Sequence, residues 1–288
     1  MSHERPRRSV LYMPASNARA IEKARDLPCD VVILDLEDAV APDQKNLARD
    51  QACAAVAAGG FGRRELVVRV NGLDTPWGEQ DLKAVAAAAP DAVLVPKVDS
   101  AADVARYDAL LRAAPPTTHL WAMIETTRSL FRLEEIADAA SRTRLSAWVM
   151  GTNDLAKETG AQIRPGRAAF LGALGLAVAA ARMARLTILD GVFNGLEDDV
   201  GLEAECRQAL EFGFDGKTLI HPRQVEIANR VFSPGDEEVA FARAVIAAFA
   251  EPENAGKGAL RVDGRMAERL HLDQSVKLVA VAEAIAAG

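Results

Sequence analysis

Two acidic residues each follow an apolar run that is typical of a buried strand. The run LWAMI (residues 120–124) ends at Glu125, and the run SAWVM (residues 146–150) leads through a Gly-Thr-Asn turn to Asp154. Carboxylates that lie close together repel each other unless a cation neutralises them. Oxygen ligands, without cysteine or a histidine pair, suit Mg²⁺ or Mn²⁺ better than zinc. We therefore predict that Glu125 and Asp154 bind Mg²⁺, with Mn²⁺ as the second option.

Further polar groups stand at or near the ends of other apolar runs. Glu37 and Asp38 follow VVILDL, and Arg69 lies inside VVRVNG. A charge within an apolar strand needs a partner, and for Arg69 we expect an anion at the end of the strand. Gly151 and Thr152 precede a predicted helix, so their N–H groups are candidates for holding a carboxylate.

Each of these residues also has a purely structural interpretation. Glu125 and Asp154 are residue types that favour helix N-termini, and a predicted helix starts directly after each of them. Glu37 and Asp38 could simply begin a loop. Arg69 is harder to explain in this way.

The elements that must position these residues alternate between strands and helices. Ala-rich amphipathic stretches separate eight short apolar runs, at residues 9–13, 30–36, 65–70, 92–96, 120–124, 146–150, 186–190 and 216–220. Strand–helix alternation predicts a parallel sheet, and eight units over this length predict an α/β fold, a (β/α)₈ TIM barrel. In such a barrel all strand ends open onto one mouth, which would make the polar residues neighbours. An open doubly wound sheet would normally carry a glycine-rich loop after its first strand, whereas MPASNARA contains no glycine.

The chain after about residue 232 has a different pattern. It predicts a helix, a loop, a short hairpin-like segment at ALRVDGRM and a last helix. We expect a catalytic barrel domain over residues 1–232 and a helical extension over residues 233–288 that packs on a neighbouring subunit.

Composition excludes several classes of protein. The net charge of −7 over 288 residues gives no basic footprint for nucleic acid or for an anionic membrane surface. No apolar run approaches the roughly 20 residues of a membrane span. The three cysteines lie far apart, which argues against a disulfide scaffold, and a cytoplasmic location is the simplest expectation.

Taken together, the motifs resemble the citrate lyase β-subunit-like proteins of the HpcH/HpaI aldolase superfamily, which include malyl-CoA and citramalyl-CoA lyases. The residues that carry this resemblance are RSVLYMPASNARAIEKA, VILDLEDAV, VRVNG, VLVPKV, MIETTRSL, GTNDLA, GFDGKTLIHPRQV and GKGALRVDGRM, in this order. The resemblance implies a magnesium-dependent lyase that cleaves or forms a 3-hydroxyacyl-CoA, with acetyl-CoA and a 2-oxo acid as the other partners.

The resemblance also implies roles for particular residues. Glu125 and Asp154 match the metal ligands, and Arg69 matches the arginine that holds the 2-oxo acid. Glu37 and Asp38 match acids that order the metal's waters. A further pair, Arg19 and Lys23, falls in the segment that meets the CoA phosphates. The resembling proteins form trimers or hexamers, in which the C-terminal tail closes over the site of an adjacent subunit.

One position departs from the family pattern. The resembling proteins carry an aspartate acid/base shortly after the G-x-M of the tail, whereas this chain places Glu268 there. With Glu268 in that role, the sequence predicts a CoA-ester carbon–carbon lyase. Three alternatives stay open: an acyl-CoA thioesterase on the same metal site, an aldolase of free 2-oxo acids, and an accessory β subunit of a larger lyase complex.

Overall fold

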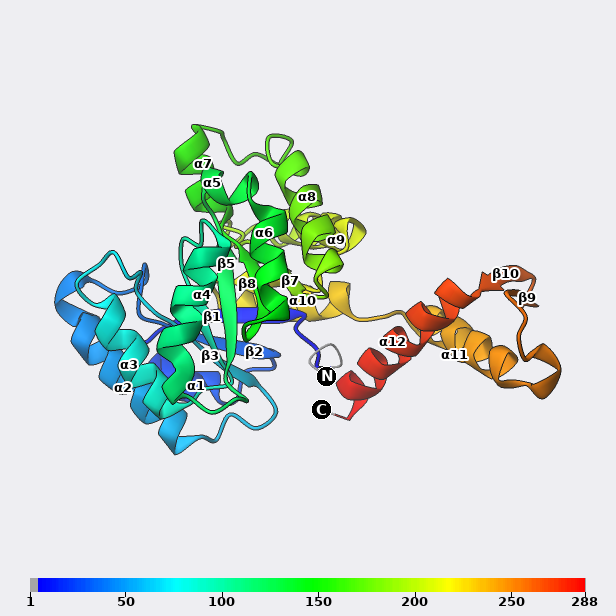
Figure 1. Cartoon of the computed structure of the whole chain (residues 1–288), viewed down its shortest axis with the longest axis horizontal. Coiled ribbons are helices and arrows are strands. Elements are labelled where there is room, and N and C mark those ends of the chain that lie inside the picture. Colours follow the sequence, from blue (N-terminus) through cyan, green and yellow to red (C-terminus); the bar gives the residue numbers. More distant parts are fainter. Residues whose placement is uncertain (1–4, 288) are drawn as a thin grey trace. The chain divides into compact units, whose positions relative to one another are not determined.

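The computed structural model describes residues 5–287 and contains eight parallel strands closed into a barrel (Figure 1). Strand β1 pairs with both β2 and β8, which closes the sheet. The barrel strands are β1 (Ser9–Pro14), β2 (Val31–Asp35), β3 (Glu65–Arg69), β4 (Ala92–Val95), β5 (His119–Ile124), β6 (Leu145–Met150), β7 (Thr187–Asp190) and β8 (Gly216–Leu219). The predicted (β/α)₈ barrel is therefore confirmed. Residues 1–4 of the predicted first domain and Gly288 lie outside the described residues.

Helices follow the strands in sequence and cover the barrel. They are α1 (Ala18–Ala24), α2 (Lys45–Ala58), α3 (Gly78–Ala88), α4 (Ala101–Leu110), α5 (Thr127–Leu130), α6 (Leu133–Asp138), α7 (Thr152–Thr159), α8 (Leu171–Met183), α9 (Asp199–Phe212) and α10 (Val225–Phe232). Two of them, α5 and α7, begin directly after β5 and β6. The residues that follow these two strands therefore lie at helix starts, where backbone N–H groups lack helical partners.

Two apolar layers explain why the strands are almost unbroken hydrophobic runs. Ile33, Trp121 and Val149 belong to a cluster that fills the barrel interior, whereas Leu34 and Trp148 pack between the strands and the helices. Alternate residues of one strand thus enter different layers, and both layers are buried. Each fully buried large side chain contributes on the order of 1.5–3 kcal/mol, which makes the barrel a rigid support for its rim.

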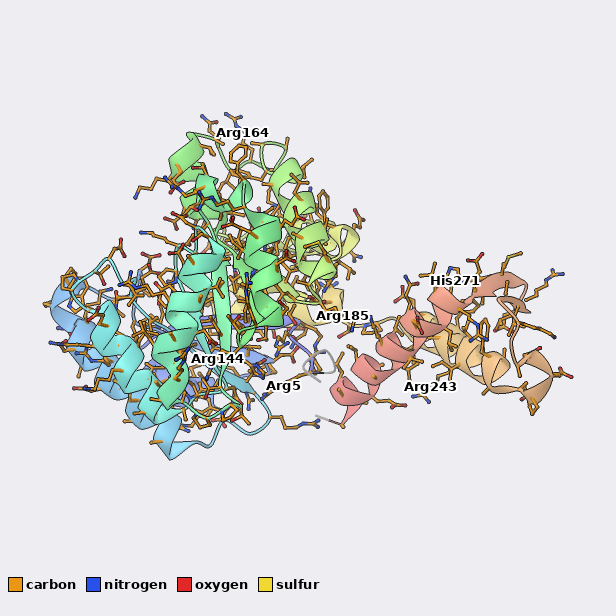
Figure 2. All side chains as sticks on the ribbon, in the orientation of Figure 1. Arg5, Arg144, Arg164, Arg185, Arg243 and His271 are labelled. Atoms are coloured by element: carbon orange, nitrogen blue, oxygen red, sulfur yellow. The ribbon has the colours of Figure 1, made fainter. Side chains whose placement is uncertain are left out.

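The chain after Phe232 forms a second compact unit. It contains α11 (Asp236–Ala250), the antiparallel strands β9 (Ala259–Val262) and β10 (Arg265–Glu268), and α12 (Arg269–Ala286). Asp263 and Gly264 join β9 and β10 with positive φ angles of 48° and 80°, as a tight hairpin requires. Arg243 of α11 pairs with a carboxylate of α12 at 3.2 Å (Figure 2). The packing of this extension on a neighbouring subunit stays a prediction.

Over residues 5–287, no helix combines the length and the apolar character that crossing a bilayer demands.

Candidate active site

The register between β2 and β3 places an acid and a base side by side. Asp35 and Arg69 are directly opposite each other in this parallel pair. Arg69 Nε donates to Asp35 Oδ1 at 2.7 Å, and Nη2 donates to Oδ2 at 2.7 Å. The two side chains are 8% and 1% exposed, so this is a buried bidentate ion pair. The predicted anionic partner of Arg69 at the strand ends is thus a side chain of the protein itself, Asp35 at the end of β2.

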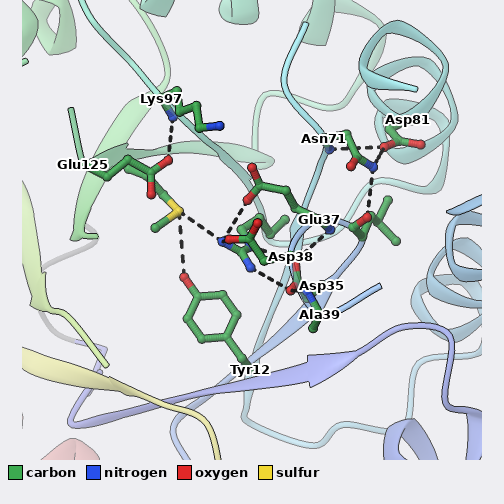
Figure 3. A network of polar contacts seen from close by, with 12 residues as sticks. Tyr12, Asp35, Glu37, Asp38, Ala39, Asn71, Asp81, Lys97 and Glu125 are labelled. Carbon is green, nitrogen blue, oxygen red and sulfur yellow. Dashed lines mark hydrogen bonds and ion pairs between the residues drawn. The ribbon is translucent and has the colours of Figure 1, made fainter. Parts of the chain in front are cut away.

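The remaining nitrogen of the Arg69 guanidinium, Nη1, faces acidic residues that follow β2. Nη1 lies 2.8 Å from Glu37 Oε2 and 3.4 Å from Asp38 Oδ2, and Figure 3 shows this network. The Glu37 contact lacks hydrogen-bonding geometry, so Glu37 Oε2 is charge-paired without accepting a directed N–H. Burial raises the pKa of Glu37 to about 8, against the lowering effect of Arg69, and the charge of Asp38 adds to the rise.

Glu125 follows the end of β5, and one of its two carboxylate oxygens accepts a hydrogen bond. The Lys97 N–H donates to Glu125 Oε1 at 2.8 Å, whereas no N–H or O–H of residues 5–287 donates to Oε2. Lys97 adopts a φ of 50°, a region that non-glycine residues rarely occupy and that clusters at functional sites. Burial raises the pKa of Glu125 to about 7, and the negative charge of Asp154 adds to the rise. Glu125 and Asp154 are therefore close enough to repel each other.

Asp154 lies in the first turn of α7, beside the end of β6. The glycine before this helix, Gly151, is needed for Glu125, because a Cβ at Gly151 would overlap the Glu125 side chain. Within residues 5–287 no group of three or more His, Cys, Asp or Glu side chains is arranged around one point. Two carboxylates completed by water or substrate oxygens remain a common Mg²⁺ arrangement, so the donors at this rim fit the predicted metal.

The structure does not support the interpretation of Glu125 and Asp154 as helix caps. Thr126 caps α5 by accepting the Ser129 N–H, and no side chain caps α7. The predicted use of the Gly151 N–H for a substrate carboxylate is wrong, because that group donates to the Ile124 carbonyl oxygen at 3.0 Å. Thr152 is the first residue of α7, so its N–H has no partner within the helix.

A cavity of about 280 Å³ lies at the C-terminal ends of the strands. It is lined by Tyr12, Asp35, Asp38, Ala39, Arg69, Met123, Met150, Gly151, Asn153, Asp154, Val192, Thr218 and Ile220. The cavity brings the Arg69 group and Asp154 to one space, as expected for strand ends that share a mouth. A cavity of this volume suits a small organic ligand.

The predicted CoA contacts are not among the residues that line this cavity. Arg19 and Lys23 are exposed on α1, four residues apart, and belong to the barrel unit. Glu268 is exposed at the end of β10, in the second unit.

Two polar residues of the cavity that contact Arg69 were missed from the sequence. Asp35 ends the apolar run VVILD, and the argument that a charge in such a run needs a partner would have found it as it found Arg69. Tyr12 lies in β1, where an aromatic residue is ordinary, so the sequence held no signal for its hydroxyl. Its ring packs 4.8 Å from the Arg69 guanidinium carbon, and its hydroxyl points at the Met123 sulfur (Figure 3).

Active sites of (β/α)₈ barrels lie at the C-terminal ends of the strands, which is where this cavity lies. The molecule thus has the architecture of a barrel enzyme whose site opens at that rim. The model of the HpcH/HpaI aldolase/citrate lyase family matches residues 8–222. The chain belongs to this family, which confirms the resemblance drawn from its motifs.

Individual relatives differ in their activity. The (3S)-malyl-CoA thioesterase of Cereibacter sphaeroides strain KD131 is 51% identical over 288 residues, covering 100% of this chain and 99% of that protein. The L-malyl-CoA/β-methylmalyl-CoA lyase of the same strain is 36% identical, covering 98% and 96%. The crystal structure of protein CitE from Mycobacterium tuberculosis in complex with magnesium, acetoacetate and coenzyme A has a TM-score of 0.75 at 30% identity, covering 96% and 97%.

These relatives correct the predicted activity. The expectation of a carbon–carbon lyase is wrong, because the full-length relatives at about 50% identity are named thioesterases, while the lyases share only about a third of their residues. The motifs could not separate the two reactions. Two carboxylates predicted to hold a metal and an arginine predicted to bind the acyl group suit cleavage of a carbon–carbon bond as well as cleavage of a thioester.

Proposed function

We propose that this protein hydrolyses the thioester of a malyl-type CoA ester, giving the free 3-hydroxy dicarboxylic acid and CoA. The observation that carries the proposal is the 51% identity, along the whole chain, with a (3S)-malyl-CoA thioesterase. The cavity supports it, because a space of about 280 Å³ with cationic and metal-binding groups suits a short acid that carries a carboxylate.

Glu125 and Asp154 are the residues that would hold Mg²⁺. The M. tuberculosis relative was crystallised with magnesium, and Glu125 Oε2 is free to accept a cation in this chain. When bound, the ion supplies a Lewis acid that chelates and polarises oxygens of the acyl group.

Arg69 is the proposed contact for the acyl oxygens, and Asp35 fixes its orientation. Hydrolysis forms a bond from a water oxygen to the thioester carbon, breaks the carbon–sulfur bond, and passes one water proton to a base. Glu37 and Asp38 are the proposed residues that orient this water, and Glu37 is poised to accept its proton, since a general base works best with a pKa near the working pH. The departing thiolate then takes up a proton. The Thr152 N–H, at the start of α7, is available to a carboxylate oxygen.

The CoA moiety and the second unit extend this proposal. Arg19 and Lys23 present two exposed positive charges on one face of α1 to the CoA phosphates. Glu268 would reach the cavity of an adjacent subunit in a homotrimer or homohexamer and assist proton transfer there. The three free cysteines agree with a reducing cytoplasm.

The products decide between hydrolysis and carbon–carbon cleavage. Purified protein is incubated with (3S)-malyl-CoA and Mg²⁺, and free thiol and all acids are followed by colorimetry and mass spectrometry. Hydrolysis releases one thiol and one malate per substrate, whereas carbon–carbon cleavage releases acetyl-CoA and glyoxylate without free thiol. Glu125→Gln serves as the matched control for trace contaminating thioesterase. Accumulation of acetyl-CoA and glyoxylate, or thiol release unchanged in Glu125→Gln, would refute the proposal.

A further inference from the structure

The hydroxyl of Tyr12 is a hydrogen-bond donor that faces only a weak acceptor. It lines the cavity, and among residues 5–287 its one hydrogen-bond contact is the Met123 sulfur at 4.0 Å, the outer limit for such a contact. A thioether sulfur is a weak acceptor. Burial raises the pKa of Tyr12, so the phenol keeps its proton and remains a donor. Hydroxyl groups inside a folded protein usually find a strong partner, and the part of the chain that the structure describes supplies none here.

A second donor is directed at the same sulfur. Arg69 Nη1 lies 3.6 Å from Met123 Sδ, while the Tyr12 ring stacks against the Arg69 guanidinium (Figure 3). Two polar hydrogens from adjacent side chains thus converge on one neutral, flexible methionine. Methionine has three rotatable bonds and yields to a competing group easily. An oxygen that entered this position would receive both donors.

We propose that Tyr12 Oη and Arg69 Nη1 together bind the thioester carbonyl oxygen of the substrate, and that the Met123 sulfur gives way to it. This inference rests on the proposed hydrolysis. As the water oxygen bonds to the thioester carbon, the carbonyl electron pair moves to this oxygen, and the two donors stabilise its developing charge until the carbon–sulfur bond breaks. Tyr12 is then a catalytic residue that touches the reacting oxygen.

The surrounding charges favour this position for an oxyanion. Glu37 lies beside the same Arg69 nitrogen. When Glu37 accepts the water proton, its negative charge disappears while one appears on the substrate oxygen. The charge next to Arg69 is therefore conserved during the step, and the site needs no rearrangement. Because Asp35 and the barrel hold Arg69 rigidly, both donors are set before the substrate arrives.

The chain offers a clean kinetic test, because it has only two tyrosines, Tyr12 and Tyr107. Tyr12→Phe removes the hydroxyl and keeps the ring over Arg69. Losing one oxyanion donor typically lowers kcat by about 10²–10³-fold, so we expect that loss with little change in KM. Tyr107→Phe is the matched control. Tyr107 lies on α4, its hydroxyl accepts the Leu73 N–H, and it is not among the residues that line the cavity, so thiol release should be unchanged.

Binding of two unreactive CoA compounds identifies the oxygen without relying on turnover. One is a ketone in which a methylene group replaces the sulfur of malyl-CoA, which keeps the carbonyl oxygen. The other is the corresponding thioether, which lacks that oxygen. With Mg²⁺ present, Tyr12→Phe should weaken the ketone about tenfold, as one hydrogen bond predicts, and leave the thioether unchanged.

A spectroscopic signal complements these variants. With 3-fluorotyrosine incorporated, Tyr107→Phe protein has a single ¹⁹F resonance, from residue 12, which should shift with the ketone and not with the thioether. Unchanged kcat in Tyr12→Phe, equal losses for both compounds, or a resonance that ignores the ketone would each overturn the inference. If the parent protein releases no thiol but Tyr12→Phe still weakens binding of the ketone and not of the thioether, the carbonyl contact stands and the hydrolysis proposal fails.

Discussion

Asp35 and Arg69 face each other across β2 and β3 and share two parallel hydrogen bonds of 2.7 Å. This pairing uses Nε and Nη2 and leaves Nη1 at the cavity. The guanidinium is therefore oriented by the sheet itself rather than by a loop. A fixed fork of this kind limits where a ligand oxygen can bind, and a misplacement of about 1 Å can cost about 10²-fold in rate.

The first prediction concerns this pair. Asp35→Asn removes the charge but keeps the shape, and it leaves Arg69 buried beside weaker partners. Breaking a buried ion pair costs about 3–5 kcal/mol, and we expect the lower end because Glu37 and Asp38 remain near Nη1. Urea unfolding of the variant measures the loss. Arg69→Lys is the companion variant, which keeps the charge, loses the fork and should raise KM. Stability within 1 kcal/mol of the parent protein for Asp35→Asn, or an unaltered KM for Arg69→Lys, would contradict the assigned roles.

The second prediction uses a glycine that makes room for a carboxylate. Gly151→Ala places a methyl group against Glu125, so the carboxylate must move. We expect Mg²⁺ affinity to fall at least tenfold while the circular dichroism spectrum stays that of the parent. Gly172→Ala is the matched control, because a Cβ there meets no atom within 4 Å. Equal Mg²⁺ affinities for the two variants in calorimetry would show that Glu125 does not bind the ion.

The third prediction is the pH dependence of metal binding. Burial raises the pKa of Glu125 to about 7, so below that pH its carboxyl group is neutral and a cation must displace a proton. Mg²⁺ affinity should therefore be nearly constant above pH 8 and fall about tenfold per pH unit below pH 7. Titrations in buffers of different ionisation enthalpy count the protons released. The Glu125→Gln variant should bind weakly at every pH; a parent protein with the same affinity at pH 6 and pH 8 would argue against this ligand.

The fourth prediction concerns Glu268 at the end of β10. If it acts in the site of a neighbouring subunit, Glu268→Gln should lower the hydrolysis rate about 10²-fold or more, as for other proton-transfer groups. Mixing this inactive protein with inactive Glu125→Gln protein should then restore part of the activity. Some sites of the mixed oligomer would combine an intact Glu125 with an intact Glu268 from the neighbouring subunit. No recovery after proven subunit exchange, or full activity of Glu268→Gln alone, would remove Glu268 from the site.

Much of the architecture could be predicted from the sequence. Strands buried on both faces give unbroken apolar runs, and all eight predicted runs coincide with barrel strands to within one residue at each end. The hairpin at Asp263 and Gly264 was also predictable, because few sequences other than Asp-Gly adopt two successive positive φ angles. The strand ends then placed Arg69 and Asp154 at one cavity.

The details of the site depend on register, which the sequence does not display. Whether Arg69 meets a ligand or Asp35 depends on which residues stand opposite each other in β2 and β3. Asp190 illustrates the same difficulty, because it ends β7 but binds Lys217 and Arg167 in a buried network instead of facing the cavity. Hydrogen bonds of backbone groups, such as the Gly151 N–H, are likewise fixed only by tertiary structure.

The division into two units has a spectroscopic consequence. All tyrosines and tryptophans precede residue 233, and Trp121 and Trp148 are fully buried in the barrel. Intrinsic fluorescence therefore reports the barrel alone, while the helices of α11 and α12 contribute only to far-ultraviolet circular dichroism. Heating followed by both signals separates the melting of the extension from that of the barrel without any label. A ligand that raises the melting temperature of one unit and not of the other binds to the unit that it stabilises.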